Sequence, residues 1–135
     1  LCPTDDPAAA APACVVGANA GWVVFADDND GNGDGLPDGH GTLDAGEGII
    51  RVQPFPNGVN VFADCNYISI AATGFTRDIP GLGAGLNNFL FCDVRGNRDL
   101  GGGNSAARTI TVAPTGRPQV YRDVARVAAT LGGCP

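Results

Sequence analysis

Hydrophobic residues in this chain occur in short runs, many of them alternating with polar residues, and this pattern predicts β-strands. The first run, residues 21–26, is apolar on both faces, which indicates a buried strand. The same criteria predict further strands at residues 49–53, 59–63, 67–72, 89–94, 108–113 and 118–121. From these strands we expect the core to contain Trp22, Phe25, Phe89 and Phe91.

The C-terminal segment has apolar residues with a helical period. Apolar residues recur there at the i, i+3, i+4 and i+7 spacing of one helix face, at Val124, Val127, Ala128 and Leu131. Asp123 is of the residue type that caps helix N-termini, and two glycines follow at 132–133. We therefore predict one short amphipathic helix over residues 123–131.

Turns are abundant, because the 135 residues include 21 Gly and 10 Pro. Tight turns are expected at Asn57-Gly58 and at Pro114-Thr115-Gly116. A chain of this length forms one domain, so residues 1–135 are expected to share a single core. The sequence has no uncharged apolar run long enough to cross a membrane. We therefore expect a single, mainly β domain.

Residues 21–52 contain an acidic, glycine-rich segment with seven of the chain's fourteen acidic residues. Asp28, Asp30 and Asn32 match the first half of an EF-hand calcium loop, and a shifted frame adds Asp34. In both frames a glycine replaces the closing glutamate, although Asp38, Asp44 and Glu47 are available as ligands in a different geometry. Two interpretations stay open: a calcium site with these four ligands, or a solvated connection between two strands.

Charge is distributed unevenly along the chain. Residues 1–92 contain two Arg and eleven acidic residues, a net charge of 2 − 11 = −9. Residues 93–135 contain six Arg and three Asp, a net charge of 6 − 3 = +3. The C-terminal third either presents a positive face to phosphate or to an acidic neighbour, or it is neutralised by the rest of the chain.

Five cysteines in a chain of this size indicate an oxidising compartment. Cys2 and Cys14 bracket a Pro- and Ala-rich segment, where a disulfide would stabilise the fold by roughly 3 kcal/mol. Cys92 and Cys134 suggest a second disulfide, worth roughly 4 kcal/mol. Cys65 is then left over, and we expect a buried free thiol there.

The sequence does not suggest an enzyme. Its one histidine, His40, lies between two glycines in the acidic segment, and neither Ser69 nor Ser105 is in a GxSxG motif. The paired carboxylates lie in a polar loop, where nothing predicts the burial that would shift a pKa. We therefore expect a non-enzymatic protein without a small-molecule substrate.

Two longer motifs resemble a known family. GWVVFADDNDGNGD followed by GEGIIRV, and later FLFCDVRG followed by ARTITVAPTGRPQV and a final cysteine, resemble the globular domain of the GspH/FimT/FimU family of minor pilins and pseudopilins. The resemblance covers nearly the whole chain. It implies a type IV pilin head of antiparallel strands in two sheets, arranged like a β-sandwich.

The resemblance also implies an N-terminal helix that is half membrane anchor and half packed against the head. We expect this chain to begin after that helix. The protein would then be anchored in the inner membrane with its head in the periplasm, and later become part of an extracellular pilus. The implied function is a minor pilin that joins other minor and major pilins near the filament tip and helps initiate assembly. A pseudopilin of type II secretion is the alternative within the family.

DNA binding is a further alternative, because some FimT-like proteins bind DNA during natural transformation through a C-terminal GRxR motif. Here the matching residues are Gly116 to Gln119, so the second arginine of the motif is missing. The candidate arginines for phosphate contacts are Arg108, Arg117, Arg122 and Arg126. Tyr121 is the one aromatic residue close to them in sequence.

Overall fold

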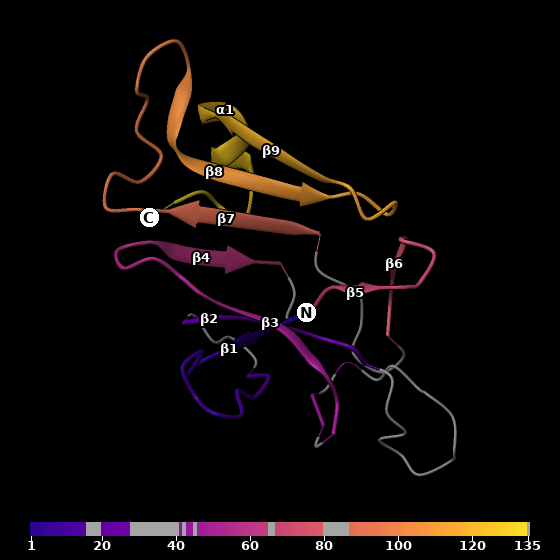
Figure 1. The fold of residues 1–135 in the computed structure, drawn as a ribbon. Coiled ribbons are helices and arrows are strands. Elements are labelled where there is room, and N and C mark those ends of the chain that lie inside the picture. The colour runs from indigo at the N-terminus through magenta and orange to yellow at the C-terminus, as the bar shows by residue number, and fades with distance from the viewer. Residues whose placement is uncertain are drawn as a thin grey trace.

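The computed structural model describes residues 1–15, 20–27, 41, 43–44, 46–64, 67–79 and 87–134. In these residues the fold is mainly β and ends in one short helix (Figure 1). The elements are β1 (Cys2–Thr4), β2 (Gly21–Phe25), β3 (Ile49–Pro54), β4 (Asn60–Ala63), β5 (Ser69–Ile70), β6 (Thr76–Arg77), β7 (Asn88–Cys92), β8 (Asn104–Val112), β9 (Pro118–Asp123) and α1 (Val124–Ala129).

The described strands form two larger sheets and one small one, all antiparallel. The N-terminal sheet has the order β1-β2-β3, and the C-terminal sheet has the order β4-β7-β8-β9. Strands β5 and β6 form a separate hairpin. The predicted mainly β, antiparallel fold with a short C-terminal helix is confirmed, and the β5–β6 hairpin is an addition to it.

Some predicted boundaries are wrong. Residues 67–72 are predicted as one strand, but they contain only β5, which has two residues. Tyr67 and Ile68 precede β5 and are buried, although they belong to no strand. Strand β8 begins four residues earlier than predicted, since its first residues form an irregular stretch opposite β9. Strands β1 and β6 were not predicted, because two or three residues are too few to show a period.

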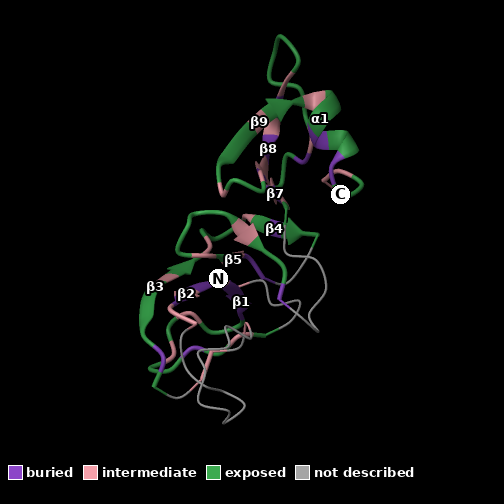
Figure 2. Cartoon of the chain, turned by 90° about the vertical axis from the view of Figure 1, so that its right-hand side faces the viewer, coloured by how far each residue is buried: buried purple, intermediate pink, exposed green. Residues whose placement is uncertain are grey.

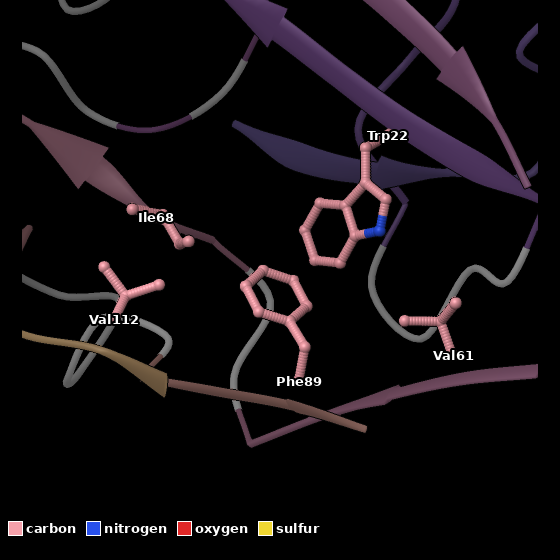
Figure 3. Close-up of a cluster of buried hydrophobic side chains, with 5 residues drawn as sticks. All are labelled: Trp22, Val61, Ile68, Phe89 and Val112. Atoms are coloured by element: carbon pink, nitrogen blue, oxygen red, sulfur yellow. The ribbon is translucent and has the colours of Figure 1, made fainter. Parts of the chain in front are cut away.

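The two larger sheets meet at an aromatic contact (Figure 3). The ring of Trp22 on β2 packs edge-to-face against Phe89 on β7, with ring centroids 5.1 Å apart. Val61, Ile68 and Val112 complete this buried cluster. Of the other predicted core residues, Phe91 is half-buried beside Phe89, whereas Phe25 is buried on the opposite face of the N-terminal sheet with Cys2 and Val23.

Helix α1 covers the other face of the C-terminal sheet. Asp123 caps it as predicted, because its Oδ1 accepts a hydrogen bond of 2.7 Å from the backbone N–H of Arg126. Val127 is fully buried against Leu90, Cys92 and Ala107. The helix is shorter than predicted and ends at Ala129, since Thr130 is already extended.

Both expected cysteine pairs are disulfides. Cys2 is bonded to Cys14, with their Cα atoms 5.5 Å apart, and joins β1 to the segment that follows it. Cys92 is bonded to Cys134, with Cα atoms 5.8 Å apart, and ties the C-terminus to the end of β7. Cys65 lies outside the described residues.

The turn between β8 and β9 contacts the turn between β5 and β6. The backbone N–H and the hydroxyl of Thr76 both donate to the carbonyl of Pro114, at 2.9 and 3.2 Å. Gly116 has a φ of +71°, and a Cβ there would lie 2.2 Å from the carbonyl oxygen of Gly74. A residue without a side chain is therefore required at position 116 for two separate reasons.

We expect Gly116→Ala to lower the free energy of unfolding by about 1–2 kcal/mol through its positive φ and by about 1–3 kcal/mol more through the clash with Gly74. Gly58→Ala is the matched control, because Gly58 has a φ of +79° but open space around its Cα. Urea unfolding of both variants measures the difference. Equal losses of stability would contradict the importance of the contact between the two turns.

Candidate functional site

An apolar groove of about 330 Å³ lies between the two larger sheets. Its lining includes Leu1, Trp22, Phe55, Phe89, Phe91 and Ile110. A groove with this many aromatic rings and almost no polar groups is suited to an apolar segment of protein. We take it as the candidate functional site.

Strand alternation positions these side chains. Trp22 faces the C-terminal sheet from β2, while Phe89 and Phe91, two residues apart on β7, both face the N-terminal sheet. Ile110 on β8 is directly opposite Phe89 and shares its face. Phe55 follows β3 and packs edge-on to Trp22, with ring centroids 6.3 Å apart. The groove therefore consists of residues that are distant in sequence.

Coverage of the C-terminal sheet decreases from β7 to its edge strand β9. Phe89, Ile110 and Val120 lie in one row across β7, β8 and β9. Phe89 is 8% exposed, Ile110 is half-buried and Val120 is 65% exposed. Figure 2 shows β9 as mainly exposed. The apolar surface of the groove thus continues onto a strip of sheet that the described residues leave uncovered.

Leu1 lies at this groove, and its amino group is largely buried. The amino group donates a hydrogen bond of 3.0 Å to the carbonyl of Ile68. Burial lowers the pKa of the amino group below its usual 8.0, while the negative charge of Asp27 partly opposes this effect. The charged form of the amino group is therefore less stable here than in water.

The groove is not predicted from the sequence. Phe55 and Leu1 lie outside every predicted strand, and Ile110 is predicted only as part of the strand at residues 108–113. The sequence signal that could have indicated the groove is the apolar ring of Phe55 between Pro54 and Pro56. Which residues line a groove between two sheets depends on long-range packing, which no local period describes.

The four arginines proposed for DNA are not gathered in one place. Arg117 is in the turn between β8 and β9, and Arg122 is five residues later, near the end of β9. The two residues are separated by about 17 Å along the extended chain. Arg126 lies on the helix side of the sheet, with its guanidinium 4.8 Å from the ring centroid of Tyr121. Arg108 faces the groove side, beside Phe91.

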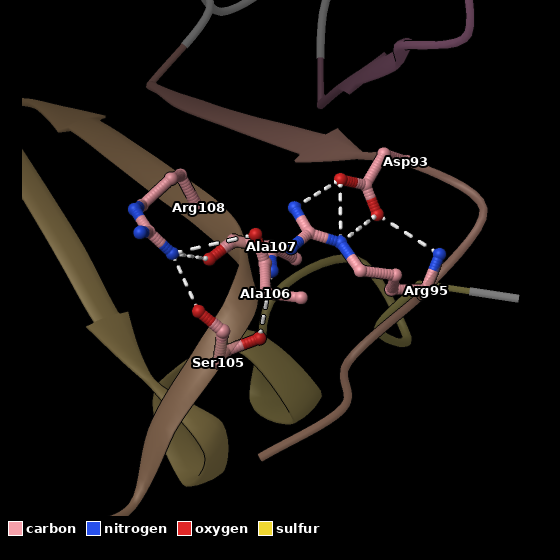
Figure 4. Close-up of polar contacts among 6 residues, drawn as sticks. All are labelled: Asp93, Arg95, Ser105, Ala106, Ala107 and Arg108. Atoms are coloured by element: carbon pink, nitrogen blue, oxygen red, sulfur yellow. Dashed lines mark hydrogen bonds and ion pairs between the residues drawn. The ribbon is translucent and has the colours of Figure 1, made fainter. Parts of the chain in front are cut away.

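Arg108 stabilises the backbone of β8 through hydrogen bonds to carbonyl groups (Figure 4). Its Nη1 donates to the carbonyls of Ser105, Ala106 and Ala107, at 2.5, 3.4 and 2.7 Å. These carbonyls belong to the irregular stretch of β8, where the pairing with β9 is interrupted. The guanidinium thus stabilises the strand irregularity and is held close to the sheet.

The CDVRG motif also forms a structural unit (Figure 4). Asp93 accepts hydrogen bonds from the backbone N–H of Arg95 at 2.9 Å and from its guanidinium, and Gly96 N–H closes the turn on the carbonyl of Asp93 at 2.9 Å. These bonds from Arg95 lower the pKa of the Asp93 carboxyl. The motif therefore shapes the turn that follows β7.

The calcium candidates Asp28, Asp30, Asn32 and Asp34 lie outside the described residues, as do Asp38 and His40. The described ends of this segment are held by their own contacts. Asp27 Oδ2 accepts from Gly41 N–H at 2.8 Å, and Glu47 Oε2 accepts from Asp44 N–H at 2.9 Å. Among the described residues, no three His, Cys, Asp or Glu side chains are grouped to hold a metal.

Both serines take part in structural hydrogen bonds. Ser69 Oγ accepts from Arg77 Nε at 2.9 Å. The buried hydroxyl of Ser105 donates to Asn97 Oδ1 at 2.6 Å and accepts from Ala107 N–H at 3.0 Å. Asn97 in turn donates to the carbonyl of Val124, so this network joins the loop after β7 to the start of α1.

Comparison of the chain with protein-family models, with curated proteins and with solved structures finds no match. Within the described residues, the structure contains no helix that would span a lipid bilayer.

We expect the buried amino group to make stability depend on pH. Its pKa is below 8.0 in the folded chain and near 8.0 in the unfolded chain, so the unfolded state binds more protons between these two values. The free energy of unfolding should therefore rise as pH increases through that window. Urea unfolding of the 135-residue chain at about pH 6 and about pH 9 measures this rise.

The control is the same chain with an acetylated N-terminus, which has no titrating amino group. We expect a smaller rise in stability between the two pH values for the acetylated chain. The comparison uses the change with pH, because the acetyl group itself alters packing. An identical change in both proteins would contradict the effect of burial.

Proposed function

We propose that this chain is the globular head of a minor pilin of the GspH/FimT/FimU family. The subunit is non-enzymatic, enters a type IV pilus near its tip together with other minor and major pilins, and helps initiate assembly. Before assembly an N-terminal helix anchors it in the inner membrane, with the head in the periplasm. The two motifs that resemble this family and the mainly β fold support the proposal.

The observation that carries the proposal is the apolar groove with its uncovered strip. In a pilin, half of the N-terminal helix packs against the head, which requires an apolar surface of the head that its own strands leave open. The groove beside Trp22 and the exposed Val120 meet that requirement. Leu1 lines the groove, so the C-terminal end of the proposed helix would lie at this surface.

The disulfides are consistent with the proposed location. Cys2–Cys14 and Cys92–Cys134 would persist in the periplasm and outside the cell, where thiols are not kept reduced. The second disulfide closes a loop that contains β8, β9 and α1. A subunit exposed on a filament would benefit from such cross-links, because no cellular chaperone reaches it there.

The two alternatives receive less support. A type II secretion pseudopilin would share the same groove, and only its assembly distinguishes it. A DNA-binding pilin would need a continuous basic surface. The arginines are instead divided between the groove side, at Arg108 and Arg122, and the helix side, at Arg126.

The test is to isolate sheared pili from cells that produce the full-length protein. We expect the protein in the pilus fraction, and we expect deletion of its gene to reduce the number of pili. Val120→Asp should reduce incorporation severalfold, because a charge in the uncovered strip opposes helix packing.

Val94→Asp is the matched control, since Val94 is 98% exposed in the turn after β7 and lines no part of the groove. Incorporation of this variant should equal that of the unaltered protein. Unchanged piliation in the deletion strain, with no protein in the pilus fraction, would reject the pilus function. Loss of protein secretion with normal pili would assign the chain to type II secretion instead.

A further inference from the structure

We propose that the helix that occupies the groove has acidic side chains along its flanks, and that these contact Arg51 and Arg122. The proposal rests on the pilin function above and adds the chemistry of the segment that the head accepts. An apolar face alone would fill the groove. The arginines on its two sides add a requirement for negative charge.

Arg122 is on the groove side of β9. Its two neighbours both point to the helix side, since Tyr121 lies under Arg126 and Asp123 caps α1. Because side chains alternate along a strand, Arg122 points to the opposite side, as Val120 does. Its side chain is exposed and has no carboxylate partner within the part of the chain that the structure describes.

Arg108 adds a second positive charge on the groove side of the C-terminal sheet. It is directly opposite Phe91, which lines the groove. Its hydrogen bonds go to backbone carbonyls, which carry no net charge and leave the guanidinium positive. The row that contains Phe91 and Arg108 is about 7 Å from the apolar row of Phe89, Ile110 and Val120.

Arg51 lies on the other side of the groove, on the edge strand β3. It is directly opposite Val24, and its Nη2 donates to Gln53 Oε1 at 2.9 Å. Val24 and Gln53 both line the groove, so Arg51 is on the same face of the N-terminal sheet. The two sheets therefore each contribute a basic residue next to the apolar surface.

Three of the described carboxylates near the C-terminal sheet already have partners. Asp93 is bound by Arg95, Asp123 caps α1, and Asp64 accepts from the backbone N–H groups of Asn87 and Asn88. The groove is thus apolar at its centre and positive at its flanks. This arrangement favours a helix with an apolar stripe and acidic flanks, and it disfavours one with basic flanks.

The experiment uses three peptides of about 18 residues, about five helical turns, with the same leucine stripe and with Glu, Gln or Lys at the flanking positions. Trp22 is the single tryptophan of the chain and lines the groove, so its fluorescence reports binding. We expect the Glu peptide to bind roughly tenfold more tightly than the Lys peptide at low salt. This preference should shrink at about 0.5 M salt, where charges are screened.

Arg51→Glu and Arg122→Glu together should reverse the preference, so that the Lys peptide binds more tightly. Arg126→Glu is the matched control, because Arg126 is exposed on α1, which covers the opposite face of the same sheet. The preference should persist in this variant. Circular dichroism and unfolding curves of each variant establish that it is folded.

Equal binding of the three peptides, or an unchanged preference in the double variant, would overturn the acidic-flank proposal but leave apolar docking and the pilin function intact. Binding of none of them would overturn the proposal as well, and the pilus fraction would still decide the pilin function separately. Duplex DNA that binds through Arg51 and Arg122 more tightly than the Glu peptide would also overturn it.

Discussion

The edge-to-face contact between Trp22 and Phe89 joins the two larger sheets, and much of the structure depends on it. Such a contact stabilises a fold by about 0.5–1.5 kcal/mol beyond the burial of its apolar area. In the described residues the N-terminal sheet has three strands, one of them of three residues, and it needs the second sheet to bury one of its faces. The same two rings form part of the groove, so the contact that holds the sheets together also shapes the surface that we propose for helix docking.

Local patterns predicted the parts of the fold that depend on local chemistry. Strand β2 follows from an apolar run, and the start of α1 follows from the ability of Asp123 to cap a helix. Both disulfides agree with the cysteine spacing. The rest could not be predicted, because it depends on residues distant in sequence. The groove and the pairing of β1 with β2 are of this kind, and so is the contact between Gly74 and Gly116.

Several polar and charged residues stabilise the fold. Asp93 and Arg95 form a turn, Ser105 belongs to a buried network, and Arg108 holds three carbonyls of an irregular strand. The surface feature that we propose for binding is the apolar groove, which is flanked by positively charged arginines. This feature depends on the packing of the two sheets, since Arg51 on β3 and Arg122 on β9 are far apart in the chain.

The disulfide between Cys92 and Cys134 changes how the protein responds to tension. The bond spans a sequence separation of 42 residues that contains β8, β9 and α1. A force applied at the C-terminus passes through the sulfur atoms directly into β7 and bypasses that hairpin and helix. Full extension of the oxidised chain is therefore shorter by about 140 Å, at roughly 3.3–3.6 Å per residue. Under mechanical load, the force is carried by the segments before Cys92, and these unfold. The strand that contains Val120 and Arg122 carries no force and stays folded.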